Sequence, residues 1–166
     1  MIRTIADFET TWTQEYERTS KLLQALTDAS LAQAVTPGGR SLGRLAWHLL
    51  ESHGKLGEQA GLTMAARFDE ARQPSSAAEI AAAYDASARA FLAAVKAAWT
   101  DADLPVEAIM YGRPWTHGMS LDILVKHEIH HRGQMTILMR QAGLEVPGIY
   151  GPAREEWAAM GKPAQD

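Results

Sequence analysis

A short stretch of the sequence, KHEIHHRGQ, contains the residue types of a metal site. On a helix, His127 and His131 would lie one turn apart on the same face, with Cβ atoms about 5–6 Å from each other. Both imidazoles could then bind one ion, at about 2.0–2.1 Å from each ligating nitrogen. The segment from His127 to His131 also spells H-E-x-x-H, the zinc motif of metalloproteases, in which Glu128 would be the general base.

The rest of the sequence argues against a metalloprotease. The extended protease motif has a glycine three residues and a histidine six residues after the second ligand, whereas this chain has Gln134 and Ile137 there. Later acidic residues lie beyond the predicted end of the helix, and no segment alternates apolar and polar residues as a substrate-binding strand would. We therefore expect Glu128 to form a structural ion pair rather than to act as a base.

A third ligand is expected from the stretch GRLAWHLLES, in which His48 lies near the middle of a predicted helix. Taken alone, a histidine between Trp47 and Leu49 is more often a core residue that makes a hydrogen bond. With His127 and His131 facing the same core, however, three neutral imidazoles from two facing helices form a coherent metal site with open positions for water or substrate. We predict His48, His127 and His131 as the metal ligands.

Three further histidines are predicted to lie outside the ligand set. His53 comes five residues after His48 and should point in another direction from the same helix. His130 lies about 100° around its helix from His131, where it could support the site or form an interface. His117 lies in a connector, and a solvent-exposed position is expected for it.

Four segments have the apolar periodicity of helices. The first runs roughly over residues 4–28, and the second begins with Ser41 as its N-cap. The third begins at a capping box that starts with Ser76. The fourth is predicted over residues 120–142, with Ser120 as its cap and a glycine directly after its end.

A loop-rich connector, residues 100–119, precedes the last long helix and could hold a short extended pair. A short helical turn is expected in the tail, around residues 155–160. Four helices with one apolar stripe each predict an all-α fold, a four-helix bundle. The chain length agrees with a single domain over residues 1–166.

Composition restricts the function further. The formal net charge is −4 and there is no run of basic residues, which argues against nucleic-acid binding. The chain has no cysteine, so thiol chemistry would need a thiol from another molecule. No stretch of about 18 apolar residues predicts a membrane span. The N-terminus has no apolar signal-peptide core, and a cytoplasmic location is expected.

Together these motifs resemble the DinB/YfiT-like superfamily of metal-binding four-helix bundles. The resemblance rests on SLGRLAWHLLES, on LVKHEIHHRGQMTILMRQAG and on the final VPGIYGP, and it covers nearly the whole chain in order. His48, His127 and His131 match the family's three metal-binding histidines one for one, and Gly133 and Gln134 match its helix signature. Gly133 is expected to let a neighbouring helix approach closely.

The resemblance implies a divalent ion, nickel or zinc, held by three histidines with water completing the coordination shell. Characterised relatives include thiol-dependent S-transferases and a thiol-dependent isomerase, which implies a low-molecular-weight thiol as cosubstrate. We therefore expect a metal-dependent S-transferase, isomerase or hydrolase that activates a thiol or water for attack on a small-molecule electrophile. A homodimer is expected as well. Two alternatives stay open: a metal-binding protein without catalysis and a dimeric interaction module.

Five more residues could contribute to such a site. Arg132 and Arg113 could attract a carboxylate of the thiol or the substrate, although exposed arginines are usually only solvated. Tyr111, Trp115 and His117 could form a lid near the metal. Aromatic residues in a connector, however, more often cover the end of a core.

Overall fold

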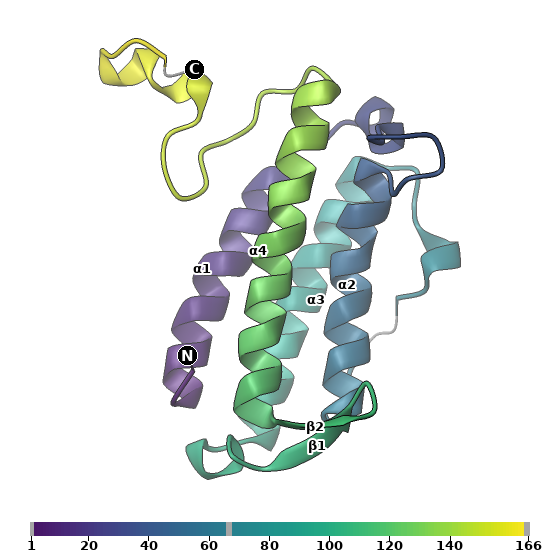
Figure 1. The fold of residues 1–166 in the computed structure, drawn as a ribbon, viewed down its shortest axis with the longest axis vertical. Helices are drawn as coiled ribbons and strands as arrows, with labels where there is room; N and C mark the ends of the chain where they lie inside the picture. The colour runs from purple at the N-terminus through teal and green to yellow at the C-terminus, as the bar shows by residue number, and fades with distance from the viewer. Residues whose placement is uncertain (1, 66–67, 165–166) are drawn as a thin grey trace.

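The computed structural model describes residues 2–65 and 68–164, which form a bundle of four long helices (Figure 1). They are α1 (Ile5–Gln24), α2 (Leu42–Gln59), α3 (Ala77–Ala98) and α4 (His117–Gln141). α1 and α2 each pack against both α3 and α4, so the order around the bundle is α1, α3, α2, α4. The predicted all-α four-helix bundle is confirmed.

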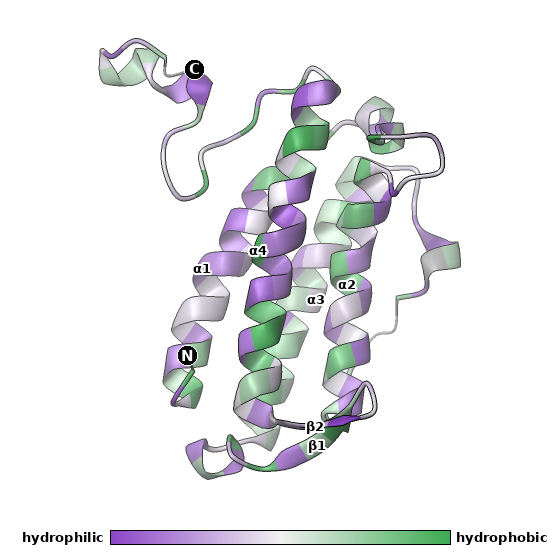
Figure 2. Cartoon of the chain, viewed as in Figure 1, coloured by the Kyte–Doolittle hydropathy of each residue, from purple (hydrophilic) through white to green (hydrophobic). Residues whose placement is uncertain are grey.

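Large apolar side chains from all four helices fill the bundle interior. The rings of Trp12 in α1 and Phe91 in α3 pack with centroids 5.5 Å apart. Trp12 is fully buried, and its indole N–H donates a 3.0 Å hydrogen bond to the carbonyl oxygen of Ala88. Figure 2 shows polar and apolar residues side by side along the same helices, as expected of helices that bury one face.

Capping side chains set where the helices begin. Ser41 and Ser76 cap α2 and α3 as predicted, each accepting a hydrogen bond from a backbone N–H three residues on. α4 begins one turn before the predicted Ser120, because Thr116 is its N-cap. Ser120 instead lies buried inside α4, where its hydroxyl donates to the carbonyl oxygen of Thr116 at 3.2 Å.

The first helix also ends earlier than predicted. α1 stops at Gln24, and a separate 3₁₀ helix, η1 (Asp28–Ala32), follows. Thr27 and Ser30 form a capping box at the start of η1. Because this box starts a new helix, α1 itself cannot continue to residue 28, although Leu26 is still buried in the core.

The connector contains a β-hairpin. β1 (Glu107–Met110) pairs with β2 (Arg113–Thr116) in antiparallel fashion. Tyr111 and Gly112 form the two-residue turn with φ of 51° and 77°, as a type I′ turn requires. The hairpin crosses one end of the bundle and leads directly into α4 (Figure 1).

Short 3₁₀ turns complete the described structure. η2 (Glu70–Arg72) precedes α3, and η3 (Asp101–Asp103) follows it. The tail contains η4 (Arg154–Glu156) and η5 (Ala158–Met160), where the sequence predicts a helical turn. Within residues 2–65 and 68–164, no helix combines the length and the apolarity that crossing a bilayer requires.

Candidate metal centre

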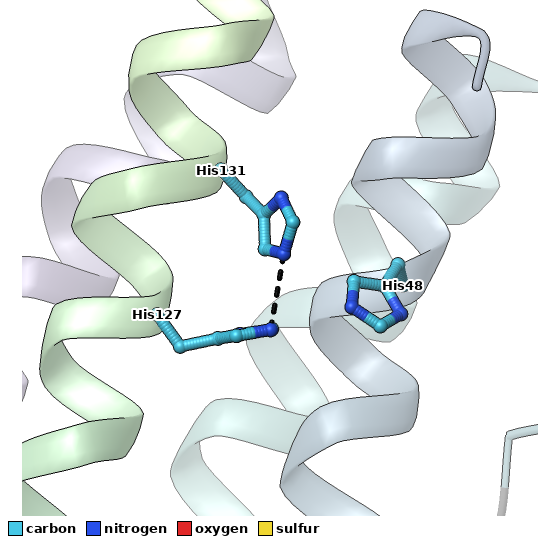
Figure 3. A group of neighbouring side chains, drawn as sticks. All are labelled: His48, His127 and His131. Carbon is cyan, nitrogen blue, oxygen red and sulfur yellow. Dashed lines mark hydrogen bonds between the residues drawn. The ribbon is translucent and has the colours of Figure 1, made fainter. Parts of the chain in front are cut away.

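The three predicted ligands meet between α2 and α4 (Figure 3). One ring nitrogen from each of His48, His127 and His131 lies within 4.8 Å of the other two. The ring centroid of His48 is 5.1 Å from that of His127 and 4.8 Å from that of His131. His131 is buried and the other two are partly buried. The described part of the chain contains no other group of three or more acidic or histidine side chains that could share one ion.

Hydrogen bonds decide which nitrogens of the α4 pair can bind a cation. Nδ1 of His131 lies 2.7 Å from Oε1 of Gln134, and because an amide oxygen only accepts, Nδ1 carries the ring proton. Nε2 of His131 then has a lone pair, which points at Nε2 of His127 at 3.0 Å. This contact is a hydrogen bond when His127 donates from Nε2. A cation bound by both Nε2 atoms would take the place of that proton.

Two further nitrogens of the group lack hydrogen bonds. Nδ1 of His48 and Nδ1 of His127 are buried and have no partner among the residues the structure describes. Leaving a buried polar atom unpaired costs about 1–3 kcal/mol. Three convergent imidazoles, two of which have an unpaired nitrogen, therefore fit a metal ion better than they fit an ordinary packed core.

Glu51 supplies negative charge beside His48. The carboxylate is buried, and its Oε2 lies 3.5 Å from Nδ1 of His48 and 3.1 Å from Nη2 of Arg44. Glu51 therefore places a negative charge beside His48, but without a hydrogen bond like the one that Gln134 accepts from His131.

The surroundings keep all three imidazoles neutral at pH 7. Burial, followed by repulsion from the imidazole of His131, lowers the pKa of His48 to about 4. The same two causes lower the pKa of His127 to about 4. Burial also lowers the pKa of His131, although its hydrogen bond to Gln134 opposes the shift. The neutral imidazole is the form that binds a metal ion.

Glu128 points away from the three histidines and into the core. It is fully buried, and its carboxylate accepts hydrogen bonds at 2.9 Å from Thr19 of α1, His53 of α2 and Tyr84 of α3. Burial favours a higher pKa for Glu128, but these hydrogen bonds outweigh burial and hold the pKa below its ordinary value. The contacts confirm a structural role for Glu128, and they show that His53 points elsewhere than His48, as predicted.

Arg132 is not available to a substrate, contrary to one expectation. Its guanidinium is buried and forms an ion pair with Glu15. It also donates to the hydroxyl of Thr19 at 3.1 Å and to that of Tyr150 at 2.6 Å. Tyr150 in turn donates to Glu15 at 2.6 Å. Arg132 therefore ties the tail to α1, and an exposed arginine was the wrong expectation.

The proposed lid is also wrong. His117 is buried rather than solvated, and its ring stacks on Trp99 with centroids 4.0 Å apart. Tyr111 is exposed and contacts Trp115, with ring centroids 5.6 Å apart. The ten residues of α4 that separate His117 from His127 span about 15 Å along the helix axis. The aromatic residues of the connector therefore cover the end of the core.

Three smaller expectations have different outcomes. His130 is exposed on α4, with its ring centroid 4.9 Å from that of His131. A Cβ added at Gly133 would meet no atom within 4 Å, so the expected close approach of another helix there is wrong. Arg113 lies exposed in β2, at the hairpin end of the bundle.

Sequence reasoning missed the polar partners of the ligands. From the sequence, Gln134 is only part of a family signature, and Glu51 belongs to no ligand motif. The available signal was spacing, because each residue follows a predicted ligand by three positions on its helix, and such pairs are neighbours on the helix surface.

Comparisons with known proteins agree with this fold. Residues 1–166 match the model of the DinB family. The chain is 45% identical over 161 residues to the uncharacterized protein YrdA of Bacillus subtilis (strain 168), a match that covers 97% of this chain and 96% of YrdA. A crystal structure of a DinB-like protein from Bacillus cereus is 43% identical with a TM-score of 0.86, over 90% of this chain and 100% of that chain. The chain belongs to the DinB family.

A more distant solved structure shares the architecture. YfiT from Bacillus subtilis, described as a probable metal-dependent hydrolase with an unusual four-helix bundle topology, is 18% identical with a TM-score of 0.64. The match covers 84% of this chain and 90% of YfiT. At this level of identity, the likeness shows a common fold.

Proposed function

We propose that the chain binds one divalent cation through His48, His127 and His131 and uses it as an enzyme on a small electrophile. The observation that carries this proposal is the convergence of three ring nitrogens within 4.8 Å, from helices that are far apart in sequence. A bound cation would lower the pKa of a coordinated water or thiol and so supply a nucleophile at neutral pH.

The residues around the histidines support a catalytic rather than a purely structural site. A closed structural site has four protein ligands, whereas a catalytic site has three and keeps a position open. The described residues offer three ligating side chains here. Gln134 accepts a hydrogen bond from His131, and the Glu51 carboxylate lies 3.5 Å from Nδ1 of His48. The buried hydrogen bonds of Glu128 fix α4 against the other helices.

Water and a low-molecular-weight thiol are both candidates for the nucleophile. The fold neighbour YfiT is described as a probable metal-dependent hydrolase, which favours water, while the sequence resemblance favours a thiol. The chain contains no cysteine, so a thiol would have to come from a cosubstrate. The sequence resemblance implies nickel or zinc, and imidazole ligands suit both. A homodimer and a cytoplasmic location stay predictions.

The reaction can be tested with defined probes. Protein reconstituted with nickel or zinc is incubated with p-nitrophenyl acetate or with monochlorobimane plus cysteine, which report hydrolysis and thiol transfer respectively. Turnover above the free-ion control that disappears in His127→Ala and remains in His130→Ala supports an enzyme. Full metal loading with no turnover for any electrophile tried would favour a metal-binding protein without catalysis.

A further inference from the structure

A cavity of about 260 Å³ lies between the segment before α2 and the second half of α4. Its walls are mostly apolar, from Val35, Leu45, Ile137 and Leu138. Val35 and Ile137 are 68% and 60% exposed, which is unfavourable for large apolar side chains unless something covers them. The volume suits a compact organic molecule, since pockets for drug-sized ligands usually exceed about 300 Å³.

Two wall residues connect the cavity to the histidines. Gln134 lines the cavity, and its Oε1 also accepts the hydrogen bond from Nδ1 of His131. Leu45 comes three residues before His48 on α2, and such residues are neighbours on one helix face. A molecule in the cavity would therefore lie next to the candidate metal centre.

Arg40 gives the cavity its charge. It lines the cavity from the loop before α2 and is exposed. Among residues 2–65 and 68–164 it has no acidic partner. A guanidinium without a partner is suited to a carboxylate, which it can bind through two parallel hydrogen bonds.

We propose that this cavity binds the electrophilic substrate, a small carboxylic acid with an apolar body, whose carboxylate pairs with Arg40 and whose apolar part contacts Leu45 and Ile137. This inference rests on the proposed function for the histidines but can be tested without it. Low-molecular-weight thiols also contain carboxylates, but they are polar along their length. The apolar walls therefore favour the electrophile over the thiol as the occupant.

Hexanoate is a suitable probe, with neutral hexanamide as its matched control. Binding is followed by NMR titration of ¹⁵N-labelled protein, both treated with a chelator and loaded with metal. In the chelator-treated protein, hexanoate should shift the amide signals of the cavity residues. Arg40→Gln should weaken hexanoate binding about tenfold, the loss of one charge-assisted contact. Arg113→Gln removes an exposed arginine at the hairpin end and should leave binding unchanged.

Each outcome separates the cavity from the metal centre. Arg40-dependent binding of hexanoate in the chelator-treated protein, with weaker and Arg40-independent binding of hexanamide, supports the cavity even if no metal binds. Equal hexanoate affinity in wild type and Arg40→Gln overturns the proposal. So does hexanoate binding that requires the metal, because the carboxylate would then be a ligand of the ion. Metal content measured on the same samples tests the histidine site independently.

Discussion

The hydrogen bond from His131 to Gln134 allows a quantitative prediction about metal affinity. At 2.7 Å it is short, and it fixes Nδ1 as the protonated nitrogen of the ring. Replacing such a partner of a metal ligand typically lowers affinity by about 10–100-fold. Gln134 is exposed, so water can replace part of the lost contact, and we expect Gln134→Leu to lie near the lower limit. A tenfold loss corresponds to about 1.4 kcal/mol of binding free energy.

The assay is competition for Zn²⁺ against a chromophoric chelator at pH 7.5. Gln134→Glu keeps an acceptor and adds negative charge, so its affinity should equal or exceed that of wild type. Gln141→Leu replaces an exposed glutamine at the end of α4 and controls for changes in helix propensity. If Gln134→Leu and Gln141→Leu bind zinc as tightly as wild type, the contact to Gln134 does not orient a ligand, and the assignment of His131 as a ligand is weakened.

Three further predictions concern the buried charges and the histidines. Glu128→Gln should lower the free energy of unfolding in urea by about 1–3 kcal/mol, because the new side-chain amide N–H₂ would face a group that now donates to the carboxylate. Glu145→Gln, at an exposed position, should change this free energy little. Hydrogen bonds from Tyr150 and Arg132 lower the pKa of Glu15 despite burial. The stabilising contribution of Glu15 is therefore present above its ordinary pKa and is lost as pH falls through the lowered value. In urea titrations from pH 7 to 3, the free energy of unfolding of Glu15→Gln should fall less with acidification than that of wild type. The pKa of His48 and of His127 is lowered to about 4, so between pH 6.5 and 4 the unfolded chain binds more protons at these residues than the folded chain does. The Tm of chelator-treated protein should therefore fall with acidification in that range. A constant Tm would contradict the lowered pKa values.

The bundle was predictable because its signals are local. Apolar periodicity gives four helices, and Ser41 and Ser76 give two of their starting points correctly. The start of α4 was missed because Ser120 and Thr116 are both good caps in isolation. The hairpin selects Thr116, since β2 ends there and passes the chain directly into the helix.

The three histidines could be grouped from sequence because helical spacing fixes one pair and the apolar helix around His48 suggests the third. The buried polar contacts could not be predicted in this way. Arg132 lies two residues from a surface position, Gln134, and only the packing of α1 and the tail shows that its guanidinium is internal. The partners of Glu128 come from three other helices, so no sequence spacing indicates them.

The central claim is that His48, His127 and His131 hold a divalent ion. The most direct measurement is elemental analysis of untagged protein purified without chelators, for wild type and for single alanine variants of these residues. The matched control is His130→Ala, an exposed histidine on the same helix; His53 is a poorer control because its hydrogen bonds to Glu128 and Ser87 support the core.

Wild type and His130→Ala should contain about one nickel or zinc ion per chain, and the three ligand variants should contain little. Wild type that stays free of metal after reconstitution would contradict the claim, and so would equal loss of metal in His130→Ala.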